Sequence, residues 1–238
     1  MAQTPLRILC IYAHPDDFEF MVGGSVARWA DEGAEVTYCV ITDGAAGSNT
    51  PGEDLRQLVK TREAEERAAA AILGVKDVIF LGYADGMLEP SLQLRRELTK
   101  IIRQLRPDRV VCGDPAAIFY GDGYINHPDH RAAGEAALYA VFPSAVSRPI
   151  FPELLAEGYE PHQVRDVYIS GALQPNAYLD ITSTIDRKAE AVQAHRSQVG
   201  PEVAEWVRQG AQETGKAAEM AYAESFRVMT LVREQAAE

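Results

Sequence analysis

The chain has 238 residues, 47% of them hydrophobic and 24% charged, which is enough for one globular domain with a large core. The net charge of −12 at pH 7 argues against a nucleic-acid partner, because no basic patch offsets it. The first residues hold only a brief apolar stretch, and no apolar run is long enough to cross a membrane. We therefore expect no signal peptide and no membrane span.

Apolar runs and helical patterns alternate along the chain. In chain order, the predicted elements are strand 7–12, helix 23–31, strand 35–41, helix 55–73, strand 77–81, helix 91–105, strand 109–112, helix 128–141, strands 164–170 and 178–181, and helices 186–198 and 201–223. The Gly-rich segment 44–52 and the Pro-rich segment 142–162 are expected to be loops, the second over the surface or the cleft. This alternation predicts a single α/β domain, residues 1–238. Its mostly parallel, Rossmann-like sheet should carry helices on both faces.

The three cysteines, Cys10, Cys39 and Cys112, each stand in or beside a predicted strand. Their odd number and wide spacing favour buried free thiols over a disulfide or a Cys-zinc site. Free thiols are typical of a reducing compartment, so we expect a cytoplasmic protein.

Two polar clusters follow the ends of predicted strands. Ala-His-Pro-Asp-Asp at 13–17 comes directly after the first strand, and His-Pro-Asp-His at 127–130 follows the fourth strand after a loop. Together they hold three of the five histidines. In the commonest doubly wound order, strands one and four are neighbours at the point where strand order reverses, and ligands bind there. We therefore expect the two clusters to meet.

The residue types in these clusters suit metal-assisted hydrolysis. Two imidazoles and a carboxylate make a zinc site with a position open for water, and the same set suits iron(II). His127 and His130 are three residues apart at a helix start, so both can face one way. Of the adjacent Asp16 and Asp17, one can bind the metal while the other faces the bound water. A structural site is disfavoured, because such sites use four protein ligands, usually including Cys.

With these motifs the sequence resembles the zinc-dependent de-N-acetylases related to N-acetylglucosaminyl-phosphatidylinositol deacetylase, the PIG-L or LmbE-like family. The matching motifs run in the family's order to about residue 200. They are 13–17, Gly23-Gly24, 42–44, Arg62 with Glu65, 81–83 with 85–86, 127–130 and 195–198. The resemblance implies a Rossmann-like metal-dependent hydrolase that removes N-acetyl or a similar acyl group from a small molecule containing an amino sugar, such as N-acetylglucosamine. One branch of the family is a hydratase, so a zinc-dependent hydratase or lyase acting on a small unsaturated acid is the alternative.

The resemblance also implies roles for individual residues. His14, Asp17 and His130 would bind the metal, and Asp16 would be the general base. His127 would protonate the leaving amine or stabilise the oxyanion, with Asp129 orienting a histidine from behind. We also expect a homo-oligomer.

Three further residues are predicted to contact substrate. Arg62 can bind sugar hydroxyls, or it can pair with Glu65 or Glu66 on a solvated helix face. Asp85 can accept hydrogen bonds from hydroxyls, or its Asp-Gly sequence can simply form a turn. Tyr124 stands beside the position at which one branch of the family has a tyrosine. His195 is left as either a core or interface histidine or a cleft residue, and Glu19 is given no catalytic role.

Overall fold

Within residues 4–232, which the computed structural model describes, seven strands form one sheet in the order β3-β2-β1-β4-β7-β9-β8. The strands are β1 (Arg7–Tyr12), β2 (Glu35–Thr42), β3 (Asp77–Tyr83), β4 (Arg109–Gly113), β7 (Asp166–Ser170), β8 (Ala177–Asp180) and β9 (Ala223–Thr230). The first five of these in the sheet are parallel, and β9 is antiparallel to both of its neighbours. Two short strands, β5 (Phe119–Tyr120) and β6 (Tyr124–Ile125), form a separate hairpin.

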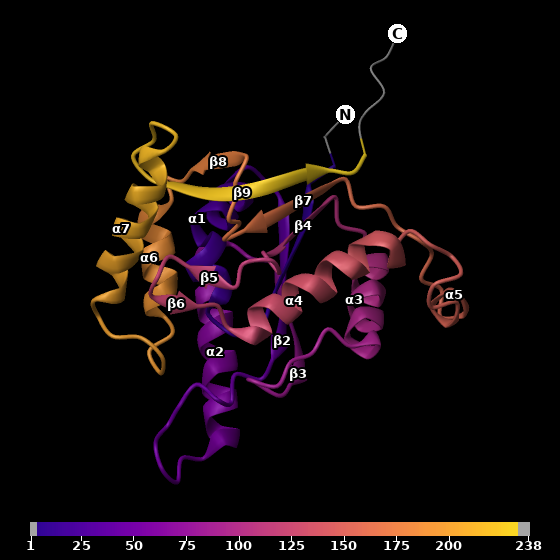
Figure 1. Ribbon diagram of the computed structural model, residues 1–238, viewed down its shortest axis with the longest axis horizontal. Coiled ribbons are helices and arrows are strands. Elements are labelled where there is room, and N and C mark those ends of the chain that lie inside the picture. Colours follow the sequence, from indigo (N-terminus) through magenta and orange to yellow (C-terminus); the bar gives the residue numbers. More distant parts are fainter. Residues whose placement is uncertain (1–3, 233–238) are drawn as a thin grey trace.

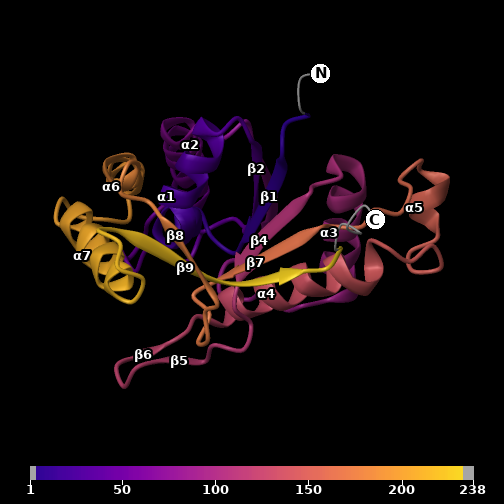
Figure 2. The same cartoon turned by 90° about the horizontal axis from the view of Figure 1, so that it is seen from above.

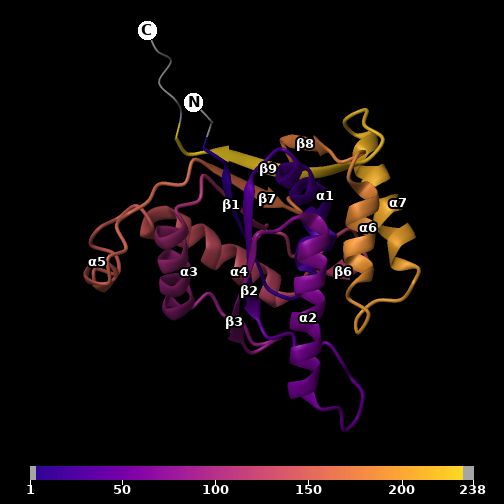
Figure 3. The ribbon, with the colours of Figure 1, turned by 180° about the vertical axis from the view of Figure 1, so that it is seen from behind.

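Helices cover both faces of the sheet (Figures 1 and 2). On one face lie α1 (Asp17–Asp31), α2 (Leu55–Leu73), α6 (Ile185–Gln193) and α7 (Val203–Lys216). On the other face lie α3 (Leu92–Leu105) and α4 (Pro128–Tyr139). Figure 3 shows α6 between α2 and α7, and these neighbours are in contact. The predicted α/β fold is confirmed.

Strand β1 shows why helices must cover both faces of the sheet. Ile8, Leu9, Cys10 and Ile11 are all at most 1% exposed. Alternate residues point to opposite faces, so Leu9 and Ile11 join the core under α3 and α4, while Ile8 and Cys10 join the core under α1 and α2. Strand β1 pairs with β4 at the point where strand order reverses, as predicted.

Some element boundaries differ from the prediction. Helix α1 begins at Asp17 rather than at Gly23. Helix α7 ends at Lys216, and residues 223–230 form β9, which was not predicted. The hairpin β5–β6 was also not predicted, because two-residue strands leave no periodic pattern.

The Pro-rich segment after α4 lies on the surface beside α3 rather than over the cleft. It contains the π-helical turn η1 (Ala140–Ser144) and the short helix α5 (Glu153–Ala156). Arg103 of α3 donates hydrogen bonds to the backbone carbonyls of Ser144 and Ser147 at 2.8 Å each, which ties the segment to that helix.

Three further predictions concern the state of the cysteines, membrane-spanning helices and the bounds of the domain. The three cysteines are free and buried, as predicted. No helix within the described residues combines the length and apolarity that a bilayer crossing requires. The two ends of the predicted domain, residues 1 and 238, lie outside the described part of the chain.

Candidate active site

The two polar clusters meet at the carboxyl ends of β1 and β4. His14 follows β1, Asp17 lies in the first turn of α1, and His130 lies in the first turn of α4. His130 Nε2 is 3.1 Å from His14 Nδ1 and 3.0 Å from Asp17 Oδ1. His14 Nδ1 is 3.6 Å from Asp17 Oδ2. The predicted meeting of the clusters is therefore confirmed.

These three side chains form a group that can hold a metal ion. Their facing atoms all lie within 4.8 Å of one another, and His14 and Asp17 are each 8% exposed. Two imidazole nitrogens and one carboxylate oxygen are a donor set that zinc accepts in catalytic sites, with a coordination position left for substrate or water. The residues present therefore fit the metal that the sequence predicts, and the same donors suit iron(II).

The ring of His14 is held from behind by two carboxylates. Its Nε2 lies 2.9 Å from Asp85 Oδ1 and 3.4 Å from Asp129 Oδ2. Asp129 is itself fixed, because it accepts hydrogen bonds from the backbone N–H groups of Gly86 at 2.7 Å and Leu88 at 3.2 Å. A carboxylate behind an imidazole sets the ring orientation and leaves the other nitrogen free to bind metal.

His130 is oriented by Asn126, a residue that the sequence analysis missed. His130 Nδ1 lies 3.2 Å from Asn126 Oδ1, and Asn126 Nδ2 donates to the carbonyl of Ala117 at 2.8 Å. The second bond fixes which end of the amide faces the ring, so His130 Nδ1 carries the proton and Nε2 faces Asp17. Asn126 directly precedes the second motif, but a single Asn in a loop gives no signal of this role.

Asp16 has a strained backbone at the edge of the cluster. Its φ of 100° lies in the left-handed region, which non-glycine residues rarely occupy. The backbone N–H of Asp16 donates to Glu66 Oε2 at 2.8 Å, and its Oδ2 lies 3.3 Å from Arg62 Nη2. Burial raises the pKa of Asp16 to about 6, and the charge of Asp17 adds to this, while Arg62 opposes it.

Arg62 is buried beneath the site, so the alternative of a solvated helix face is wrong. It is 4% exposed and donates to the carbonyls of Gly44 and Pro15 at 2.8 Å each. A Cβ at Gly44, whose φ is 67°, would lie 2.9 Å from the guanidinium, so this loop needs glycine to approach the arginine. Arg62 Nη1 also lies 3.8 Å from Asp85 Oδ2.

His127 caps α4 beside the metal-binding group. Its Nδ1 accepts the backbone N–H of Asp129 at 3.2 Å, so the proton of the neutral ring sits on Nε2. Its ring centroid is 4.7 Å from that of His14, and its side chain is 38% exposed. Burial lowers the pKa of His127, and the charge of His14 adds to this, while Asp129 opposes it.

A second buried cluster lies behind Asp16. Glu19, Glu66 and His195 are all 0% exposed. His195 Nε2 is 3.1 Å from Glu19 Oε2 and 3.9 Å from Glu66 Oε2. Burial raises the pKa of both glutamates well above the usual range. His195 is thus a core histidine rather than a cleft residue, and Glu66 links this cluster to the Asp16 backbone.

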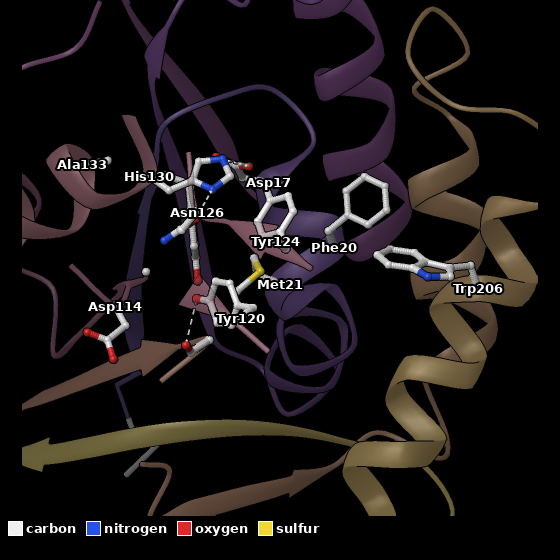
Figure 4. A pocket seen from close by; sticks show the side chains of 13 residues that line it. Asp17, Phe20, Met21, Asp114, Tyr120, Tyr124, Asn126, His130, Ala133 and Trp206 are labelled. Atoms are coloured by element: carbon white, nitrogen blue, oxygen red, sulfur yellow. Dashed lines mark hydrogen bonds and ion pairs between the residues drawn. The ribbon is translucent and has the colours of Figure 1, made fainter. Parts of the chain in front are cut away.

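An apolar cavity of about 430 Å³ opens next to Asp17 and His130. Figure 4 shows it bounded by side chains from α1, the β5–β6 hairpin, α4 and α7. Tyr124, one of the predicted substrate contacts, lines it and is 54% exposed. Asp85, another predicted contact, is 6% exposed at its side chain and accepts the backbone N–H of Ala46 at 3.0 Å.

Comparison with known proteins agrees with this geometry. The model of the family described as GlcNAc-PI de-N-acetylase (PIG-L) matches residues 9–141, which include both motifs. The chain belongs to the PIG-L family. It is similar to a diacetylchitobiose deacetylase of Thermococcus kodakarensis, with 34% identity over 93% of this chain and 82% of the relative.

Further PIG-L relatives cover most of the chain. A probable N-acetyl-alpha-D-glucosaminyl L-malate deacetylase 2 of Bacillus anthracis is 30% identical over 85% of this chain and 86% of its own length. The solved structure of the N,N′-diacetylchitobiose deacetylase from Pyrococcus horikoshii superposes with a TM-score of 0.88. It is 33% identical and covers 95% of this chain and 85% of its own.

Proposed function

We propose that the protein is a zinc-dependent N-deacetylase that hydrolyses the amide C–N bond of a small N-acylated amino sugar. The observation that carries the proposal is the convergence of His14 Nδ1, Asp17 and His130 Nε2 beside the carboxylate of Asp16. The deacetylase names of the relatives support the same reaction and an N-acetylglucosamine-containing substrate.

The proposed mechanism gives each residue one task. His14, Asp17 and His130 hold the metal, which when bound supplies a Lewis acid for the amide carbonyl and lowers the pKa of water. Asp16 takes a proton from the attacking water as general base. His127 presents its Nε2–H to the oxyanion that develops on the amide, or in its imidazolium form would protonate the leaving amine, and Asp129 keeps the His14 ring in place.

We propose Arg62, Asp85 and Tyr124 as the residues that contact or shape the substrate site, Tyr124 through the apolar cavity that it lines. Arg62 and Asp85 act mainly by fixing the loop at Gly44 and Ala46, since their polar atoms already bond to it. We further propose that the chain works as one catalytic domain in a homo-oligomer. The free buried thiols support a cytoplasmic location.

A substrate screen tests the proposal. Zinc-loaded protein should release acetate and a free amine from N-acetylglucosamine derivatives, and the variant His14→Ala should release neither. The hydratase alternative is assayed in parallel by the loss of ultraviolet absorbance of small unsaturated acids. Consumption of an unsaturated acid without any amide hydrolysis would overturn the deacetylase proposal in favour of that alternative.

A further inference from the structure

We propose that the cavity beside the metal-binding group receives the acyl group of the substrate, and that the enzyme prefers N-acyl groups longer than acetyl. The inference rests on the proposed function and specifies its substrate class. The acyl group would be a linear alkyl chain or an arylalkyl group, because the cavity is apolar and aromatic.

The position of the cavity is the first argument. Its inner end is formed by Asp17 and His130, two of the three proposed metal ligands, and Figure 4 shows Trp206 on the side away from them. Trp206 and Tyr124 are 65% and 54% exposed, so the cavity reaches the surface. Its volume of about 430 Å³ lies in the range that holds whole small molecules, and the methyl group of an acetamide would fill only a small part of it.

The chemistry of the wall is the second argument. Phe20, Met21 and Ala133 contribute apolar surface, and the Phe20 ring packs edge-on against Trp206 with 5.8 Å between centroids. The wall thus offers alkyl and aromatic contact from three different elements, α1, α4 and α7.

Most polar groups in the wall, other than the proposed metal ligands and the exposed Tyr124 hydroxyl and Trp206 indole N–H, are already engaged by the protein. The hydroxyl of Tyr120 donates to the carbonyl of Gly171 at 2.9 Å, and the hydroxyl of Tyr12 is 2.6 Å from Ser170 Oγ. Asn126 is used by Ala117 and His130, as described above. Asp114 accepts the backbone N–H of Ala116 at 2.9 Å. A sugar ring placed here would bury hydroxyls against partners that are already bonded, which costs free energy.

The arrangement of polar and apolar groups around the site determines which side of the substrate amide occupies the cavity. An amide held at the metal has an acyl arm and an amino-sugar arm. Asp16 and His127, whose side chains are 18% and 38% exposed, do not line the cavity, so polar groups that a sugar can reach lie apart from it. Hydroxyls need those polar groups, and the acyl arm is therefore the one that the apolar cavity takes.

Two matched substrate series test the inference. One series is glucosamine carrying N-acetyl, N-butanoyl or N-hexanoyl, and the other is N-acetylglucosamine carrying a methyl or hexyl aglycone. Full burial of one methylene is worth about fourfold in binding. We expect kcat/KM to rise at least about tenfold from N-acetyl to N-hexanoyl, with no comparable gain from the hexyl aglycone. Calorimetry with metal-free protein should give the same order of Kd values for the N-acyl series.

Variants locate the effect in the cavity. Trp206→Ala removes an exposed wall, and Ala133→Leu narrows the cavity from α4. Both should lower the ratio of N-hexanoyl to N-acetyl kcat/KM several-fold. Leu92→Ala, at an exposed site on α3 that does not line the cavity, is the matched control and should leave the ratio unchanged.

The outcomes separate the inference from the proposed function. Hydrolysis of the N-acetyl compound with equal or falling rates along the acyl series overturns the acyl-chain inference and leaves the deacetylase proposal standing. A gain that follows the aglycone also overturns it and assigns the cavity to the other arm. If no N-acyl compound is hydrolysed by the zinc-loaded protein, the proposed function and this inference both fail.

Discussion

Asp16 shows how neighbouring groups prepare a single residue for catalysis. Its unusual backbone is held by Glu66, and its carboxylate contacts the positive Arg62 and is influenced by the negative charge of Asp17. Strain of this kind persists only where surrounding contacts over-determine it. Because the pKa is raised to about 6, a base at this position is protonated in mildly acidic solution. The rate should therefore fall as the pH drops through about 6.

Asp16→Asn tests this role. Asn tolerates the left-handed backbone region, so the fold should be retained. General-base help is commonly worth about 10²–10⁴-fold, and we expect kcat to fall by that factor with metal content unchanged. Metal stoichiometry and kcat are measured on the same preparation. Loss of the metal would mean that Asp16 is a ligand and that its role and that of Asp17 are exchanged.

At the same scale, the sequence predicts the site residues that stand in distinctive motifs, but it misses the residues that orient them by hydrogen bonds. His14, Asp17 and His130 are recognisable because their types and spacing suit a metal. Asn126 and Glu66 act through one hydrogen bond each, and they join the site only through the fold. Arg62 falls between these two groups. The sequence places it on a helix but does not determine whether its side chain is buried at the site or solvated.

At the scale of elements, apolar periodicity predicts the interior of the fold better than its ends. Asp17 and Glu19 are acidic residues that favour a helix start, yet the polar motif there reads equally as a loop, so α1 begins earlier than predicted. The strand β9 alternates burial at Phe226 and Arg227, but the Ala-rich segment before it favours helix. Pairing with β7 and β8, which lies outside any local window, decides the outcome.

A pair of glycine variants tests how closely α4 must approach the sheet. A Cβ at Gly134 would lie 2.5 Å from the carbonyl oxygen of Gly113 in β4, so Gly134→Ala must displace the helix that carries His130. We expect a loss of about 1–3 kcal/mol in the free energy of unfolding, together with weaker metal binding. Urea denaturation and metal titration measure the two effects.

The matched control for this prediction is Gly210→Ala on α7. A Cβ there meets no atom within 4 Å, so the change should stabilise the protein by roughly 0.5–1 kcal/mol. Equal unfolding free energies for the wild type and Gly134→Ala would show that α4 can shift freely and that its close approach does not position the site.

At the scale of the whole molecule, topology accounts for both what was predictable and what was not. The parallel pairing of β1 and β4 brings residues from distant parts of the chain to one edge of the sheet, and the strand-order rule anticipates this. No comparable rule predicts the apolar cavity, because its wall combines α1, the β5–β6 hairpin, α4 and α7. No single segment carries a pattern for it, so only the assembled fold reveals it.

Metal binding should therefore stabilise the molecule as a whole. The ligands come from the β1–α1 junction and from α4, so a metal held by the native site connects two segments that the unfolded chain leaves apart. Binding to the native state alone adds about 2.7 kcal/mol at a free zinc concentration of 100 Kd. For a domain of this size each kcal/mol raises Tm by about 2–4 °C, so zinc should raise it by roughly 5–10 °C.

Differential scanning calorimetry before and after chelation measures the shift, and His14→Ala supplies the control. His14 contributes one of the three facing donor atoms, and its loss should reduce the zinc-dependent rise to a small fraction of the wild-type value. Leu92→Ala, at an exposed residue outside the metal-binding group, should keep the full rise. If His14→Ala gains as much in Tm as the wild type, then zinc stabilises the fold at another place and the proposed ligand set is wrong.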